Sequence, residues 1–257
     1  METLPGFEVV RAVAPRPMVT RAADDDGAMP TMEIRFSAFG KWYEIDSFWE
    51  GRFLERTERG AFAKTIREAG DRVKVLFNHG FDPSVGQKVL GAVEDLREDS
   101  DSPVGVVPMF DTTYNRDLLP GLEAGVYGSS MRMRVIKDEW NDEPGRSDHN
   151  PDGIPERTIK EVRLVEFGPV TFPANPDSTA GVRSMTDTYY EQLRSQDPHQ
   201  VEELARARQT RTPVRGAADG TPQGDGAART TADEPPAGHS GLTPAQRRER
   251  ILNMGRQ

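Results

Sequence analysis

One histidine of this chain stands where an imidazole can take part in chemistry. The sequence holds four histidines and no cysteine. His79 follows an apolar, strand-like run, residues 73–77, and comes just before a turn at Gly80, whereas the other three histidines lie in polar segments. Because the chain has no thiol, a nucleophile activated by His79 must be a hydroxyl.

A serine on a later predicted strand supplies such a hydroxyl. Strand alternation over residues 125–136 puts Ser129 on one face with apolar side chains, and Ser130 on the other face with Arg132 and Arg134. We expect the first face to lie in the core and the second to be open, so that Ser130 is the accessible hydroxyl. Its cationic neighbours could help to hold negative charge as it develops. The alternative is that Ser130 is an ordinary polar residue on the surface of a strand.

A carboxylate, Glu166, interrupts residues 162–170, where both faces of a predicted strand look apolar. Burying an ionised carboxylate without a partner is costly, so a protonated histidine or an arginine is expected beside it. A structural ion pair with Arg163 or another arginine is the alternative. Together, His79, Ser130 and Glu166 supply the base, nucleophile and orienting acid of acyl transfer. The residues alone also leave open that all three serve structure only.

The composition describes an acidic chain that is too polar to pack uniformly. Of its 257 residues, 35% are hydrophobic, and it holds 20 prolines and 24 glycines, so we expect part of it to be unstructured. The net charge of -9 argues against direct nucleic-acid binding. No segment reads as a membrane helix or a signal peptide. We therefore expect a soluble, cytosolic protein whose partner is another protein.

The sequence predicts neither a cofactor nor a metal site. It holds no Gly-rich phosphate loop and no dinucleotide-binding fingerprint. Residues 148–153 imitate the start of an EF-hand calcium loop, but Ile159 stands at the twelfth position, where a bidentate glutamate is required. We interpret this segment as a polar turn.

The periodicity predicts a mostly β, α+β domain, with a barrel as one arrangement of its strands. We expect residues 1–30 to form a flexible arm, residues 31–194 the domain, and residues 195–257, which lack aromatic side chains, a disordered tail with a short helix beginning near Thr243. Strands are predicted at 32–36, 42–45, 72–78, 86–95, 104–110, 125–136 and 157–172, and helices at 60–70, 114–124 and 178–194.

Four segments resemble the capsid maturation (prohead) proteases of tailed bacteriophages. They are Glu55-Arg56 with Gly60-Ala61-Phe62, Leu76-Phe77-Asn78-His79 with Val85-Gly86, Gly125-Val126-Tyr127-Gly128-Ser129-Ser130-Met131, and Val165-Glu166-Phe167-Gly168-Pro169-Val170-Thr171-Phe172-Pro173-Ala174-Asn175-Pro176. The last is the most specific, and the likeness covers roughly residues 32–185. It implies a serine endopeptidase with a mostly antiparallel, herpesvirus-assembly-protease-like β-barrel flanked by helices.

The resemblance also implies roles and partners. His79 matches the family's base, Ser130 its nucleophile and Glu166 its acidic position. The expected substrates are the scaffolding segment of the major capsid protein, a separate scaffolding protein and the chain's own flexible ends, inside the assembling procapsid in the host cytoplasm. A monomer and an oligomer are both compatible with the sequence. A non-catalytic capsid assembly module and a protease–scaffold fusion are the competing functions.

The sequence departs from the family's pattern in two places. Arg132 replaces a small residue or glycine two positions after the serine, which leaves open whether Ser129 or Ser130 is the nucleophile. Gly168-Pro169 replaces the usual Ser-Leu, which leaves the local strand geometry open.

Overall fold

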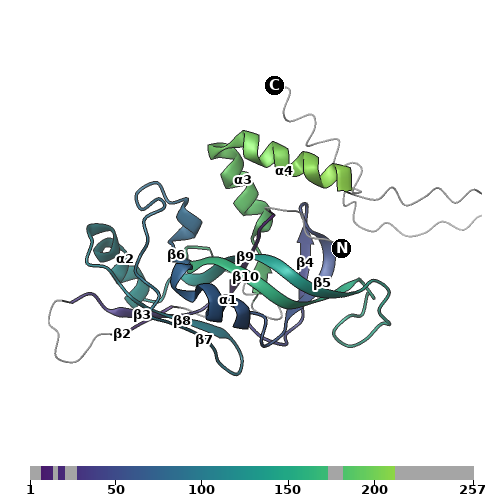
Figure 1. The fold of residues 1–257 in the computed structure, drawn as a ribbon, viewed down its shortest axis with the longest axis horizontal. Coiled ribbons are helices and arrows are strands. Elements are labelled where there is room, and N and C mark those ends of the chain that lie inside the picture. The colour runs from purple at the N-terminus through teal and green to yellow at the C-terminus, as the bar shows by residue number, and fades with distance from the viewer. Residues whose placement is uncertain (1–6, 14–16, 21–27, 173–181, 212–257) are drawn as a thin grey trace, which may run out of the picture. The chain divides into compact units, whose positions relative to one another are not determined.

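The computed structural model describes residues 7–13, 17–20, 28–172 and 182–211 (Figure 1). All of these residues belong to one compact unit, which ends at Pro213. In chain order the elements are β1 (Val9–Val13), β2 (Met18–Thr20), β3 (Thr31–Arg35), β4 (Tyr43–Ser47), β5 (Gly51–Thr57), α1 (Ala63–Ala69), η1 (Gly70–Arg72), β6 (Lys74–Val75), η2 (Asn78–Gly80), β7 (Asp95–Glu98), β8 (Pro103–Pro108), α2 (Thr113–Glu123), β9 (Gly128–Asn141), β10 (Glu156–Val170), β11 (Val182–Ser184), α3 (Thr186–Gln196) and α4 (Pro198–Arg211).

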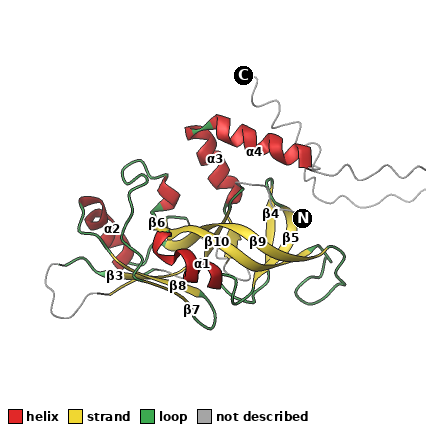
Figure 2. Cartoon of the chain, in the orientation of Figure 1, coloured by secondary structure: helices red, strands yellow, loops and turns green. Residues whose placement is uncertain are grey.

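The larger sheet has seven strands and is built around β9 and β10, which form a long antiparallel pair (Figure 2). Its order is β11-β1-β9-β10-β5-β4. The first part of β10 pairs in parallel with β5, and a later part, at Glu166 and Phe167, pairs in parallel with β6. This later part of β10 therefore lies between β9, which carries Ser130, and β6, which leads into the loop with His79.

The smaller sheet is fully antiparallel, in the order β2-β3-β8-β7. Met32 and Ile34 of β3 are buried, whereas Thr31, Glu33 and Arg35 are only partly buried. This period of two is the sequence signal that predicted the strand.

The core beneath the site confirms the buried face that alternation predicted for β9. Ser129, Met131, Met133 and Val135 are all buried. Phe167 of β10 stacks on Phe36 with ring centroids 4.6 Å apart, a geometry that adds to the stabilisation from burial alone. These contacts fix the core-facing sides of β9 and β10, so the side chains on their opposite faces are held in defined positions.

A second core cluster joins the two C-terminal helices to the larger sheet. It consists of Val10, Trp49, Tyr189, Tyr190 and Val201. The rings of Trp49 and Tyr190 lie 4.6 Å apart between centroids, and Val201 of α4 is completely buried. The helix α3 is thereby packed against β1, close to the strand that carries Ser130.

The α+β class and the dominance of antiparallel strands are as predicted, but the predicted barrel is wrong. The described strands form two sheets, and neither of them closes. The strands predicted at 32–36 and 42–45 correspond to β3 and β4, which belong to different sheets. The strand predicted at 86–95 is also wrong, since the residues before β7 at Asp95 form turns and loop.

The structure departs from the predicted boundaries at both ends. Residues 9–13, expected in a flexible arm, form the fully buried β1 between β9 and β11. Residues 198–211, expected in a disordered tail, form α4. The remainder of that tail and its helix near Thr243 lie outside the described residues.

Candidate active site

His79 is placed by an unusual backbone turn that follows β6. Asn78 and His79 both have positive φ, at 47° and 57°, in the left-handed region that non-glycine residues rarely enter. Asparagine and histidine are among the residues that tolerate it best. The turn is fastened to the end of β10: Thr171 N–H donates to Asn78 Oδ1 at 2.9 Å, and Asn78 Nδ2 donates to Thr171 Oγ1 at 3.0 Å.

The three residues chosen from the sequence lie together in the structure. Ser130 Oγ is 2.9 Å from His79 Nε2, and His79 Nδ1 is 2.5 Å from Glu166 Oε1. Each comes from a different element: Ser130 from β9, Glu166 from β10 and His79 from η2. The imidazole therefore bridges a hydroxyl and a carboxylate, which is the connectivity of a serine nucleophile, base and acid.

The carboxylate fixes which ring nitrogen of His79 can act as a base. An ionised carboxylate only accepts hydrogen bonds, so Nδ1 must carry the proton that it donates to Glu166. In the neutral ring, Nε2 is then the unprotonated nitrogen, and it faces Ser130 Oγ. A second acceptor, the carbonyl oxygen of Arg11 in β1, lies 3.0 Å from the same hydroxyl.

Gly168 permits the close approach that brings these elements together. A Cβ at this position would stand 1.9 Å from the carbonyl oxygen of Leu76, so the segment leading to His79 crosses directly over the glycine. Gly168 also pairs with Ser130 across the β9/β10 ladder. The Gly168-Pro169 pair is thus accommodated within β10, which continues to Val170.

The prediction that Ser130 is solvent-accessible is wrong. Ser130 is 0% exposed, because β1 pairs with β9 and places Ala12 opposite Ser130. Ser129 is equally buried, but on the opposite face of β9, with the core methionines. Of the two serines, Ser130 is the one within hydrogen-bonding distance of His79.

Glu166 has a hydrogen-bonding partner and a cation beside it, as its buried position requires. Its side chain is 1% exposed and contacts both His79 and Arg132, whose Nε lies 3.6 Å from Glu166 Oε1. Arg163, the other partner considered from the sequence, is exposed.

Two residues near the site carried no signal in the sequence that marked them as part of it. Tyr189 of α3 is buried, and its ring lies edge-on to the imidazole of His79 with centroids 6.3 Å apart. Glu8, from the segment expected to be flexible, contacts Arg132 and Arg134. Both approach the site from elements distant in the chain, which local periodicity does not relate.

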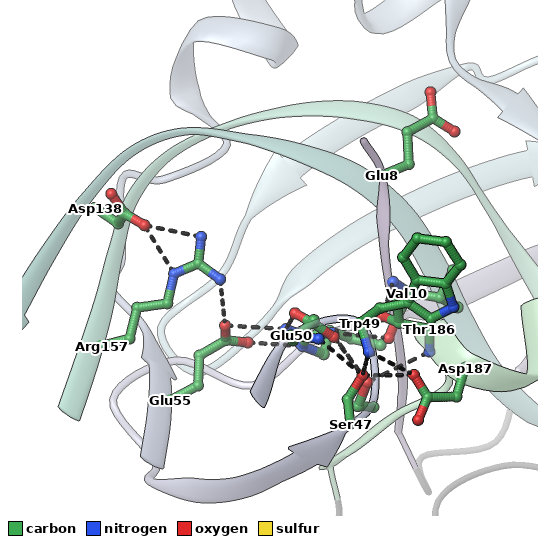
Figure 3. A network of polar contacts seen from close by, with 12 residues as sticks. Glu8, Val10, Ser47, Trp49, Glu50, Glu55, Asp138, Arg157, Thr186 and Asp187 are labelled. Carbon is green, nitrogen blue, oxygen red and sulfur yellow. Dashed lines mark hydrogen bonds and ion pairs between the residues drawn. The ribbon is translucent and has the colours of Figure 1, made fainter. Parts of the chain in front are cut away.

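A buried network of ion pairs (Figure 3) includes Arg11, the residue whose carbonyl oxygen lies 3.0 Å from Ser130 Oγ. Arg11 is fully buried and pairs with Glu50 at 2.6 Å and Glu55 at 2.7 Å. Glu55 also pairs with Arg157, which binds Asp138 in turn. Burial by itself would raise the pKa of Glu55, but Arg11 and Arg157, with hydrogen bonds from Arg11 and Tyr43, hold it below its ordinary value. The network anchors the residue whose carbonyl faces Ser130.

The remaining sequence motifs show no second candidate site. No cluster of three or more His, Cys, Asp or Glu side chains that could hold a metal lies within the described ranges. The EF-hand-like segment forms a turn closed by backbone hydrogen bonds between Ser147 and Asn150, with the ring of His149 stacked on Trp42. Residues 173–176, the Pro-Ala-Asn-Pro motif, lie outside the described residues. No described helix is long and apolar enough to cross a bilayer.

Comparison with known proteins gives a family match over most of the chain. The model of a family described as caudovirus prohead serine protease matches residues 18–192. Among solved structures, the capsid assembly protease of bacteriophage T4 is similar, with 13% sequence identity and a TM-score of 0.40. The alignment covers 65% of this chain and 99% of that one. No curated protein matches the sequence.

Proposed function

Because the chain belongs to the caudovirus prohead serine protease family, we propose that it is a capsid maturation endopeptidase in which Ser130 is the nucleophile, His79 the general base and Glu166 the orienting acid. The observation that supports these roles is the continuous chain of contacts from Ser130 Oγ through the imidazole to the carboxylate, at 2.9 and 2.5 Å.

The first half of the reaction follows from the positions of the protons. Ser130 Oγ attacks the carbonyl carbon of the scissile peptide while His79 Nε2 takes the hydroxyl proton. The imidazolium that forms is stabilised by Glu166, which also keeps the ring from rotating. Backbone N–H groups are the expected donors to the oxyanion.

The second half restores the enzyme. His79 gives its proton to the leaving nitrogen as the C–N bond breaks, which leaves an acyl group on Ser130. Water then attacks this ester while His79 takes one of its protons, and His79 returns that proton to Ser130 Oγ as the ester C–O bond breaks and the acid product departs.

The substrates we propose are those of capsid assembly. They are the scaffolding segment of the major capsid protein, a separate scaffolding protein and the ends of this chain itself, cleaved inside the assembling procapsid in the host cytoplasm. Residues 214–257, which are rich in small and polar residues, have the composition of chain that proteases cut readily.

The test is coexpression of the full chain with its capsid protein. Mass spectrometry should find cleavage products with the wild type and with Ser129→Ala, and none with Ser130→Ala. The Ser129 variant is the matched control, since both serines are buried on the same strand. Products that persist with Ser130→Ala would disprove the assignment, and a wild type without products would favour a non-catalytic assembly module.

A further inference from the structure

Arg132 approaches the candidate acid without forming a hydrogen bond to it. It lies two residues after Ser130 on β9 and opposite Glu166 in the ladder. Its side chain is 19% exposed, and its Nε is 3.6 Å from Glu166 Oε1, beyond hydrogen-bonding range but close for two opposite charges.

Two buried polar atoms at this contact are left without hydrogen bonds. Arg132 Nε and Glu166 Oε2 are both sealed from solvent, and no hydrogen-bond partner for either lies in the part of the chain that the structure describes. A buried donor or acceptor without a hydrogen bond costs free energy. The interaction that remains between the two groups is the attraction of opposite charges 3.6 Å apart.

Other groups hold the guanidinium of Arg132 in place. Its Nη1 donates to the hydroxyl of Tyr189, and the guanidinium carbon lies 5.1 Å from the centre of that ring. Glu8 Oε2 is 3.4 Å from the same Nη1. Burial acts to lower the pKa of Arg132, but the negative charge of Glu166, with Tyr189 and Glu8, more than offsets it and raises that pKa. The positive charge is therefore permanent at this position.

We propose that Arg132 is a positioning residue that holds Glu166 as an anion and sets the pH range over which His79 can act as a base. The catalytic role of Arg132 rests on the proposed function, but the coupling between the charges of Arg132 and Glu166 is independent of it. A fixed cation beside the pair favours the carboxylate and disfavours the imidazolium. Arg132 thereby favours the charge distribution that a base requires, which is an anionic Glu166 and a neutral imidazole at His79.

The charge balance around His79 determines the sign of the effect. Glu166 faces the imidazole from β10, Tyr189 from α3 and the neutral Ser130 from β9, while Glu8 faces Arg132 from the segment before β1. Removal of Arg132 leaves Glu166 and Glu8 without this cation. Removal of a cation from beside an imidazole and a carboxylate favours the protonated form of each, which gives the direction of the effect expected in the variant.

The experiment is an NMR titration of the imidazole of His79 in the full chain, with its signals assigned by their absence in His79→Gln. In Arg132→Met, the midpoint of the titration should rise by roughly one pH unit. In Arg132→Lys, which keeps the charge, it should stay near that of the wild type.

Arg134→Met is the matched control. Arg134 lies on the same face of β9 and also pairs with Glu8, but it is 41% exposed and its ion pair is with Glu8 rather than Glu166. Solvent screens its charge, so the midpoint should move far less than in Arg132→Met. Should Arg132→Met fail to fold, Glu8→Gln gives the opposite prediction: removal of an anion should lower the midpoint.

The dependence of kcat/KM on pH separates a positioning role of Arg132 from the other roles. A positioning role moves the acid limb of the profile to higher pH in Arg132→Met. A donor to the oxyanion or a purely structural residue would instead lower kcat/KM by one factor at all pH values, with the limb unmoved; that result overturns the proposal. If the wild type cleaves nothing, the proposed function fails, whereas an unmoved midpoint in an active enzyme refutes only the role of Arg132.

Discussion

At the scale of single residues, the site depends on a backbone conformation that glycine would adopt more readily. Asn78 and His79 are consecutive and both left-handed, yet neither is glycine. Such conformations cost free energy and persist where surrounding contacts hold them. Here the two hydrogen bonds between Asn78 and Thr171 hold the turn, and this aims the imidazole at Ser130.

Asn78→Val should therefore impair the site more than Asn78→Gly does. Both variants lose the side-chain hydrogen bonds, but a β-branched residue at a φ of 47° adds a penalty of roughly 1–2 kcal/mol, whereas glycine adds none. Because only the folded chain is held in this left-handed turn, the valine variant should have the lower free energy of unfolding in urea. Equal stabilities would mean that the left-handed turn is not retained in solution.

Glu166→Gln should lower kcat by about 10⁴-fold, as expected when the acid of such a triad is replaced by an amide. The amide is isosteric but no longer an anion, so it can neither select the Nδ1-protonated ring nor stabilise the imidazolium. A peptide that spans a cleavage site in the capsid protein provides the assay.

Glu161→Gln is the control for this loss of charge. Glu161 is on the same strand, but it pairs with Lys64 and Lys137 rather than with the site. The kcat of Glu161→Gln should match that of the wild type. A comparable loss of kcat in both variants would assign the effect to β10 as a whole.

At the scale of elements, β10 positions His79 in two ways. Its residue Glu166 binds His79 directly, and two residues later Gly168 lets the segment before His79 cross the strand. Gly168 has no positive φ, so it is required for space and not for conformational freedom.

Gly168→Ala should separate β6 from β10. Backbone rather than a flexible side chain stands 1.9 Å from the added Cβ, so the clash is relieved only if the strands move. We expect a loss of about 3 kcal/mol in the free energy of unfolding, the upper part of the range for overpacking. Gly145→Ala, where nothing lies within 4 Å of an added Cβ, should change it little. Similar unfolding midpoints for the two variants would contradict the close crossing.

At the scale of the whole molecule, the buried ion pairs connect β1, β5, β9 and β10 (Figure 3). Glu55 is the central anion, since it binds both Arg11 and Arg157. Replacing it by glutamine leaves two buried guanidinium groups undercompensated. Glu55→Gln should therefore lower the free energy of unfolding by about 3–5 kcal/mol. Glu44→Gln, which removes an ion pair to Arg52 with both side chains about half exposed, should cost no more than about 1 kcal/mol.

Glu55 also makes stability depend on pH. Because its pKa is lower in the folded chain, the unfolded chain binds a proton more readily, and acid favours unfolding. This contribution is complete above the ordinary glutamate pKa and is lost as the pH falls through the lowered value in the folded state. The free energy of unfolding of the wild type, measured in urea, should fall with acidification over that window. The slope of this free energy against pH should be shallower in Glu55→Gln. Equal slopes in the two proteins would show that Glu55 does not contribute to the pH dependence of stability.

The sequence predicts the parts of the molecule that repeat a local pattern. The core face of β9 follows from alternation at Met131 and Met133, and α1 and α2 lie close to the predicted helices at 60–70 and 114–124. The three site residues were also chosen from residue type and resemblance. Local pattern does not reveal pairing between distant segments. The strand β1, from residues with no strong alternation, pairs with β9 beside Ser130, so Ser130 is buried although Arg134 on the same face stays partly exposed.

The complete burial of Ser130 has a kinetic consequence. A fluorophosphonate, which reacts with activated serine hydroxyls, cannot reach Ser130 Oγ while the side chain is fully buried beside β1, so we expect covalent labelling to require an opening motion. The rate of labelling should then level off at the rate of that opening as the concentration of reagent increases. The plateau would measure how often the hydroxyl of Ser130 becomes accessible.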